Sequence, residues 1–449
     1  MKTLDMTEGR PIKLILQFAL PLFIGTLFQQ LYNVTDTMIV GYGLGGNAVA
    51  AVGATSALYA VLVNFASGMN SGYGIVISGA FGGKDWGKLR RAFASMVVLN
   101  LSITLILTAV ALLFLKSLLF WIDTPTEIFQ QAYQYILIIL SGMITTISYN
   151  MGAGFLRAVG NSRTPLYFLI LSCGLNIAMD LLFVMVLHIG VGGAAIATVI
   201  AQGISAGLCL VYIVKNYREF LPDKGDWKLS GKLMGEMLST GFSMGLMLSV
   251  FSIGSIFLQK AVNILETPII TANTASRKVY ELLMMPLSII ATANTMFVSQ
   301  NFGAKKYKRI TRAMRQVMGL ELAWSFFSVL IAYALGEVLV RMLIGINDSF
   351  VIENAVLNLR VCTLFFFPLG VLLVLRSAMQ SMGYKIAPVI SSGIELGFKI
   401  VFAFMIIPQM GYPGVVITEP IIWVVCAVYL GYIFLVSRRR RTEQFDTKK

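Results

Sequence analysis

The sequence predicts an all-α polytopic membrane protein with twelve transmembrane helices in two parallel six-helix repeats. Its 449 residues are 57% hydrophobic and only 12% charged, whereas about a quarter of the residues in soluble domains are charged. Apolar stretches of roughly 20 residues or more, each long enough to cross a bilayer as a helix, recur along the whole chain. A basic motif that begins at Phe81 also recurs from Phe302. Together these observations predict the fold class.

The apolar stretches divide the chain into twelve predicted spans. They cover residues 14–41, 48–79, 92–121, 127–156, 165–187, 191–215, 233–262, 268–300, 310–343, 352–382, 388–408 and 413–436. The opening segment, "MKTLDMTEGRPIK", has no cleavage site of small residues. We therefore expect the first span to be retained rather than removed as a signal peptide.

The repeat is visible in two cytoplasmic segments. "FGGKDWGKLRRA" (Phe81–Ala92) and "FGAKKYKRITRA" (Phe302–Ala313) share Phe, Gly, Lys, Arg and Ala in register, 221 residues apart. The glycine pair at positions 190 and 193 is repeated at the same offset, at positions 411 and 414. We therefore expect an N-terminal lobe over residues 1–215, a cytoplasmic linker over 216–232, and a C-terminal lobe over 233–449. Because six is even, the two lobes share one topology.

The net charge of +14 reflects topology rather than nucleic-acid binding. We assign 28 of the 35 basic residues to one side of the membrane, and the positive-inside rule then makes both termini cytoplasmic. The run Arg438–Arg441 follows the last span, where it would anchor the chain to lipid headgroups. We expect a multi-pass protein of the bacterial plasma membrane that acts as a monomer, with the bilayer as its partner and no nucleic acid.

Residues typical of enzymes and metal centres are scarce. The four cysteines lie within apolar spans without metal-site spacing, and the single His188 falls at a helix end. No paired histidines or HExxH pattern occurs. We therefore expect no enzyme activity and no cofactor.

Two acids lie deep in the first six spans, Asp36 and Asp180. No Lys or Arg falls between Lys13 and Lys84, so no local cation neutralises Asp36. A charged side chain in the bilayer costs a few kcal/mol on insertion scales and is by default a candidate functional residue. The alternative is a pair of neutral, hydrogen-bonded acids that only pack the helix bundle.

Other polar residues reach a similar depth. Asn176 lies one turn from Asp180, and Thr198 lies on the following helix. Further polar positions that we expect to line the same cavity are Gln29, Asn33, Tyr135 and Gln202. An acid pair without cations, surrounded by amide and hydroxyl groups, is suited to bind a proton or Na⁺.

The second half carries charges that are compensated within its own helices. Glu395 and Lys399 are spaced i,i+4, as are Arg277 and Glu281, with Lys278 beside them. Swapping the charges of Glu395 and Lys399 is then expected to restore what single neutralisation damages. Lys278 and Glu281 are candidates for substrate contact.

Several motifs together resemble the multidrug and toxic compound extrusion (MATE) antiporters, in their prokaryotic DinF-like branch. They are "LPLFIGTLFQQLYNVTDTMIVG" in the first span, "FGGKDWGKLRRA" after the second, "RAVGNSRTP" before the fifth, "LNIAMDLLF" within it, and "MMPLSIIATANTMFVSQNFGAKK" through the eighth. The resemblance covers essentially the whole chain. It also implies a bend in the first helix, for which Pro21 is the available helix breaker.

This resemblance implies roles for individual residues. In the DinF-like branch the coupling site is an Asp in the first helix, an Asn and an Asp one turn apart in the fifth, and a Thr in the sixth. Those roles fall on Asp36, Asn176, Asp180 and Thr198. The implied function is secondary active export of amphipathic, often cationic, organic compounds by H⁺- or Na⁺-coupled antiport through alternating access.

Two other functions are compatible with the composition. One is a flippase for lipid-linked oligosaccharides or peptidoglycan precursors, in the same superfamily. The cations that would meet a pyrophosphate are Lys260, Arg277, Lys278, Arg360 and Lys399. The missing extra helices and the acid pair argue against it. The other is a channel, which would carry potential-driven current without counter-ion flux.

The topology can be tested by labelling. A cysteine placed directly after Arg441 should react with a membrane-impermeant maleimide only in inside-out vesicles, because the basic residues hold that end in the cytoplasm. Labelling of the same cysteine in intact cells would reverse the predicted orientation.

Overall fold

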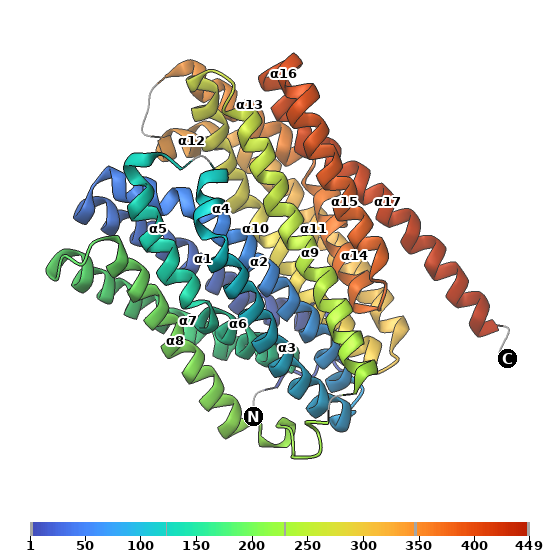
Figure 1. Ribbon diagram of the computed structural model, residues 1–449. Helices are drawn as coiled ribbons and strands as arrows, with labels where there is room; N and C mark the ends of the chain where they lie inside the picture. Colours follow the sequence, from blue (N-terminus) through green and yellow to red (C-terminus); the bar gives the residue numbers. More distant parts are fainter. Residues whose placement is uncertain (1–2, 123, 229, 345–347, 447–449) are drawn as a thin grey trace. The chain divides into compact units, whose positions relative to one another are not determined.

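The computed structural model describes residues 3–122, 124–228, 230–344 and 348–446, with residues 343–344 and 438–446 as backbone only. The described chain is helical throughout (Figure 1). Its helices are α1 (Pro11–Leu44), α2 (Gly46–Gly82), α3 (Trp86–Leu113), α4 (Leu115–Trp121), α5 (Thr126–Ser141), α6 (Met143–Ala158), α7 (Arg163–Asp180), α8 (Val191–Asn216), α9 (Gly231–Val262), α10 (Thr267–Gly303), α11 (Tyr307–Ala334), α12 (Gly336–Ile344), α13 (Ser349–Leu364), α14 (Phe366–Ser381), α15 (Ile386–Val401), α16 (Ile407–Met410) and α17 (Tyr412–Asp446). Three short elements complete the order: the π-helices η1 (Leu181–Val186) and η3 (Phe402–Ile406), and the 3₁₀-helix η2 (Arg218–Phe220). The side chains of the predicted anchor Arg438–Arg441 lie outside the described residues.

The predicted spans correspond to the observed helices. Ten helices in the described chain are long and apolar enough to cross a membrane, and up to twelve if two bent pairs each count as one span. The bent pairs are α5 with α6, at 45°, and α13 with α14, at 50°. The all-α polytopic fold class is therefore confirmed. The sequence did not predict the bends, which follow Ser141 and Leu364.

The internal repeat is also visible in the backbone conformation. Residues with positive φ recur in register in the two halves: Lys84 (55°) with Lys305 (58°), Gly190 (80°) with Gly411 (63°), and Gly160 (87°) with Gly383 (85°). The first two pairs are 221 residues apart and the third is 223 apart. Each half also contains one π-helix, η1 after α7 and η3 after α15. The two halves thus repeat one order of elements.

The chain forms two compact units. Unit 1 contains the described residues up to Glu8 and then Gln17–Ser249; unit 2 contains Gly9–Leu16 and the described residues from Val250 onward. In unit 1, α2 packs against α3, α5 and α6, and α8 packs against α5, α6 and α7. In unit 2, α10 packs against α11, α13 and α14, and α17 packs against α14 and α15.

The units divide within α9 rather than at the predicted linker over 216–232. The reason is the close packing of the first half of α9 on α2. A Cβ atom on Gly72 would lie 2.5 Å from the Cα of Gly241, and one on Gly68 would lie 2.7 Å from the Cα of Gly245. Paired glycines let two helix backbones approach closely. This approach holds the first half of α9 in unit 1.

The glycine contact gives a stability prediction. Gly72→Ala should destabilise the protein by about 1–3 kcal/mol, because the added methyl group meets backbone that cannot move aside. Gly53→Ala is the matched control on the same helix, since a Cβ there meets nothing within 4 Å. The measurement is the unfolding midpoint of each purified variant in detergent. Equal midpoints for the two variants would contradict this packing.

Candidate ion-coupling site

The candidate site lies in unit 1, where α1, α7 and α8 bring the predicted polar residues together. Asn176 and Asp180 are spaced i,i+4 and so share one face of α7. Asp180 is the last residue of α7 before the π-helix η1. π-Helical turns are rare and occur often at functional sites. Here η1 also approaches α1, since a Cβ on Gly43 would lie 2.6 Å from the Val184 side chain.

Asn176 connects the acid on α7 to the hydroxyl on α8. With the amide oriented so that it satisfies both neighbours, its nitrogen donates to Asp180 Oδ2 at 2.6 Å. Its oxygen then accepts from Thr198 Oγ1 and from the Thr198 backbone nitrogen, both at 3.2 Å. Asn176 and Asp180 are buried and Thr198 is half-buried. This arrangement fixes the Asp180 carboxyl group in one orientation.

Asp36 of α1 meets Asp180 directly. The two carboxyl groups are within hydrogen-bonding range of each other. A carboxyl group can donate to another only when it carries a proton, so the pair needs a shared proton or a bound cation to remain together. Within the described residues, the Oδ1 atoms of both acids are buried and have no hydrogen-bond partner. Neither carboxyl group has a Lys or Arg among its interactions in the described chain.

A ring of hydroxyl groups surrounds the two acids. The Tyr32 hydroxyl lies 3.4 Å from Thr198 Oγ1. Tyr135 of α5 is within electrostatic range of Asp36, Asp180 and the hydroxyl groups of Tyr32 and Tyr59. Sequence reasoning did not select Tyr32, although its i−4 spacing from Asp36 places both on one face of α1 and could have identified it.

The other polar residues predicted for the cavity lie in different surroundings. Gln29 and Asn33 are exposed on α1. Gln202 is half-buried on α8, one turn from Thr198. Their part in substrate binding stays a prediction.

Comparison with known proteins places this chain in a family. The MatE family model matches residues 21–182 and 241–405. The chain belongs to the MatE family. The resemblance predicted from the sequence motifs is therefore confirmed.

Individual relatives are distant but align over most of the chain. The probable multidrug resistance protein YpnP of Bacillus subtilis is 25% identical over 386 residues, which is 85% of each protein. The multidrug export protein MepA of Staphylococcus aureus is 23% identical over 97% of this chain and 96% of its own. A crystal structure of a MATE protein in the bent conformation matches with a TM-score of 0.89 at 22% identity, covering 100% of this chain and 99% of that one. At this identity the match establishes the fold.

The second unit of this MatE chain contains a buried charge network instead of an acid pair. Lys399 donates to Glu395 Oε1 at 3.1 Å, as the i,i+4 spacing predicted. It also lies 3.3 Å from Glu419 and 4.5 Å from the centre of the Phe251 ring. Arg376 donates to the other Glu395 oxygen at 3.1 Å. Lys399 is fully buried. The network therefore holds two cations and two acids and is neutral as a whole.

The network changes the expected result of the charge swap between Glu395 and Lys399. The swap would place a cation beside Arg376 and a carboxylate beside Glu419. Like charges at these distances repel strongly when buried. We therefore expect the swap to fail, contrary to the expectation from the i,i+4 pair alone.

The repeat relates this network to the acid site of unit 1. At the 223-residue offset between α7 and α15, Asn176 corresponds to Lys399. At the 221-residue offset between α8 and α17, Thr198 corresponds to Glu419. The neutral Asn176–Thr198 contact of MatE unit 1 is thus replaced by an ion pair in unit 2.

Further charged residues of unit 2 lie on α10 and α11. Arg277 donates to Glu281 at 2.8 Å, as predicted, and Lys278 and Glu281 are exposed. Glu321 is fully buried, and neither of its carboxyl oxygens has a hydrogen-bond partner in the described chain. It lies against Gly370 of α14, where a Cβ would come within 2.7 Å of Glu321 Oε2.

The charge network gives a second stability prediction. Lys399→Met should destabilise the protein by about 3–5 kcal/mol, because it leaves Glu419 without the cation that this buried network supplies. The double variant Lys399→Met/Glu419→Gln should recover much of this loss, since Arg376 still balances Glu395. Unfolding midpoints and the yield of monodisperse protein measure both effects.

The control is an exposed pair of the same spacing. Arg341→Met removes the cation from the Arg341–Glu337 pair, whose side chains are 43% and 59% exposed. It should change the midpoint little. An unchanged midpoint in Lys399→Met would show that the buried network does not support the fold.

Proposed function

We propose that this chain is a secondary active multidrug exporter that exchanges an inward-moving H⁺ or Na⁺ for organic compounds. Membership of the MatE family supports the class of activity. The observation that carries the coupling proposal is the direct contact between Asp36 on α1 and Asp180 on α7. Two carboxyl groups in contact, with no cationic partner in the described chain, form a site whose stability depends on a bound cation.

Coupling follows from what the pair does with and without that cation. When a proton or Na⁺ is bound, repulsion between the acids is cancelled and Asp36 can stay against Asp180. When the site is empty, the two carboxylates repel each other at low dielectric. Asp180 is held by Asn176, whereas no side chain of α1 between Gly25 and Ile39 is fully buried. The α1 segment that carries Asp36 is therefore the partner that moves.

The oxygen atoms available suit either ion. For a proton, one carboxyl group would donate to the other. For Na⁺, the orphan Oδ1 atoms of both acids and the Thr198 hydroxyl would serve as ligands, since hard cations prefer oxygen. The ion is cargo in either case, and the proposal requires no cofactor and no enzymatic step.

The substrates and location are inferred from the family and the charge pattern. The relatives YpnP and MepA carry multidrug resistance and multidrug export in their names. We infer amphipathic, often cationic, organic substrates, moved across the bacterial plasma membrane by a monomer with cytoplasmic termini. Exposed polar groups such as Lys278 and Glu281 are candidates for substrate contact.

The charge contacts disfavour the flippase alternative. Lys399 is surrounded by Glu395 and Glu419, and Arg277 is paired with Glu281. A pyrophosphate would have to displace these carboxylates to reach the cations. These two ion-paired cations therefore offer no excess positive charge to a lipid-linked pyrophosphate.

The coupling proposal is tested by substitution at the acids. Asp36→Asn and Asp180→Asn should each abolish gradient-driven export while the protein still inserts and folds, because a site that does not change charge gives the ion no differential affinity. Asn176→Ala and Thr198→Ala should weaken coupling less, since each removes a neutral contact worth about 1 kcal/mol. Efflux of a labelled organic cation and ion flux are measured in the same proteoliposomes, with pH and Na⁺ gradients imposed separately.

Glu281→Gln is the control, because this exposed acid lies in unit 2. It should leave ion flux coupled to efflux and change at most the affinity for substrate. Normal coupled transport in both Asp variants, with loss of coupling in Glu281→Gln, would move the coupling site to unit 2. Efflux that responds to neither gradient in the unsubstituted protein would refute antiport altogether.

A further inference from the structure

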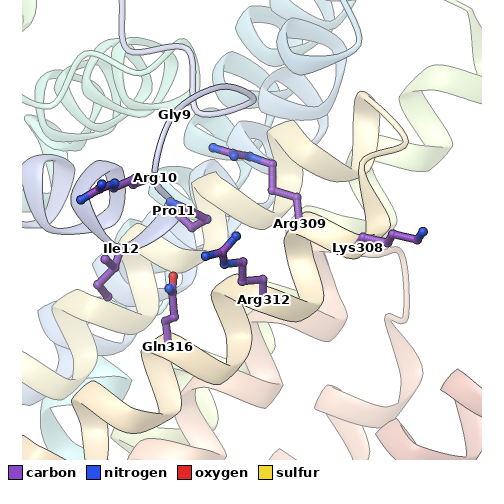
Figure 2. Close-up of a pocket in the computed structure, with 8 residues that line it drawn as sticks. All are labelled: Gly9, Arg10, Pro11, Ile12, Lys308, Arg309, Arg312 and Gln316. Carbon is purple, nitrogen blue, oxygen red and sulfur yellow. The ribbon is translucent and has the colours of Figure 1, made fainter.

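A basic pocket in unit 2 is separate from both polar clusters described above. It is a cavity of about 670 Å³ between the start of α1 and the start of α11. Its lining residues are Gly9, Arg10, Pro11, Ile12, Lys308, Arg309, Arg312 and Gln316. Figure 2 shows Arg309, Arg312 and Gln316 reaching from α11 toward the Gly9–Ile12 segment, whereas the end of Lys308 points away from it. All of these residues belong to unit 2.

The charged residues that line this pocket are all basic. Four of its eight described lining residues are Lys or Arg, and none is Asp or Glu. The Arg309 guanidinium lies 5.3 Å from the centre of the Phe297 ring, which favours one orientation of its side chain. Cations gathered at a cavity without a carboxylate in its lining attract an anion from outside the chain.

The corresponding basic motif of unit 1 has different surroundings. The motif that supplies Arg309 and Arg312 corresponds, 221 residues earlier, to Lys88 and Arg91 of unit 1. There, Lys88 pairs with Glu236 at 3.0 Å. The first copy of the basic motif thus meets a carboxylate of its own unit, and the pocket of the second copy has none in its lining.

Two further features describe the anion. Gln316 presents a buried carboxamide oxygen that has no hydrogen-bond partner in the described chain, so the ligand should bring a donor such as a hydroxyl group. Pro11 and Ile12 provide an apolar wall beside the cations. The guanidinium group of arginine donates paired hydrogen bonds to two oxygens of a phosphate group.

We propose that this pocket binds a phosphate group that carries a neighbouring hydroxyl donor, in an acidic phospholipid headgroup or in a free phosphate ester. Arg309 and Arg312 hold the phosphate, and the Gln316 oxygen accepts from the hydroxyl group. Occupation joins the Gly9–Ile12 segment to α11 through the ligand. Binding at this site is independent of the Asp36–Asp180 pair, because it needs no ion gradient and no transported substrate.

The test uses the full chain purified in dodecyl maltoside. Its unfolding midpoint is titrated with phosphatidylglycerol, with phosphatidylcholine and with sn-glycerol 1-phosphate. Phosphatidylglycerol should raise the midpoint saturably. Phosphatidylcholine should not, because its ammonium group meets the pocket cations. A saturable rise with sn-glycerol 1-phosphate as well assigns the site to free phosphate esters, and its absence assigns the site to the lipid.

The variants locate the binding. Arg309→Gln/Arg312→Gln should weaken the phosphatidylglycerol effect about tenfold or more. Arg315→Gln removes one charge from an exposed position of α11 outside the pocket, is the matched control for Arg312→Gln, and should leave the effect unchanged. If the double variant does not fold, Arg312→Gln alone carries the test, since Arg312 is exposed. Equal responses of the pocket variant and Arg315→Gln, or an equal response of the wild type to phosphatidylcholine, would overturn the proposal.

Discussion

The contact between Asp36 and Asp180 is the constraint on which the candidate site depends. Three polar side chains connect to it: Asn176 donates to Asp180, Thr198 donates to Asn176, and the Tyr32 hydroxyl lies 3.4 Å from that of Thr198. The chain thus fixes one acid firmly and leaves the other on a helix that is less buried. Two carboxylates, one fixed and one less restrained, do not attract each other. In the proposed function a cation supplies the missing attraction, so that cation binding and the position of α1 are linked.

Within the described residues, the two repeat-related clusters bury acidic side chains in opposite ways, unit 1 without cationic partners and unit 2 with them. Unit 2 has Lys399 and Glu419 where unit 1 has Asn176 and Thr198, and it adds Arg376 to balance Glu395. A closed network of this kind has no need of an external ion, and breaking it is costly. Unit 1 keeps two acids and no cationic partner among its described contacts. The backbone order is therefore shared, and a few side chains make the difference in charge between the two clusters.

Much of this architecture was predictable, because hydrophobic composition indicates which segments lie in the membrane and i,i+4 spacing indicates which side chains are neighbours. Hydropathy gave all twelve spans, and the i,i+4 rule joined Asn176 to Asp180 and Glu395 to Lys399. The Asp36–Asp180 contact required two helices far apart in sequence, and only the scarcity of intramembrane acids pointed to it. Arg376 was missed because its partner Glu395 is 19 residues away, across a helix connection that periodicity does not describe. Tyr32 was missed because sequence reasoning did not apply the same spacing rule to the aromatic residue four positions before Asp36.

The path of α1 explains how an event at Asp36 can be absorbed without disturbing the rest of the helix. The first residues of α1, up to Leu16, belong to unit 2, and the rest of the helix belongs to unit 1 from Gln17. Pro21 lies inside α1, one turn beyond this division. Because proline has no backbone N–H, the hydrogen bond that would reach the Gln17 carbonyl is absent. Helices bend at prolines more readily than elsewhere. In the proposed function, a change in tilt of the segment carrying Asp36 is taken up at Pro21.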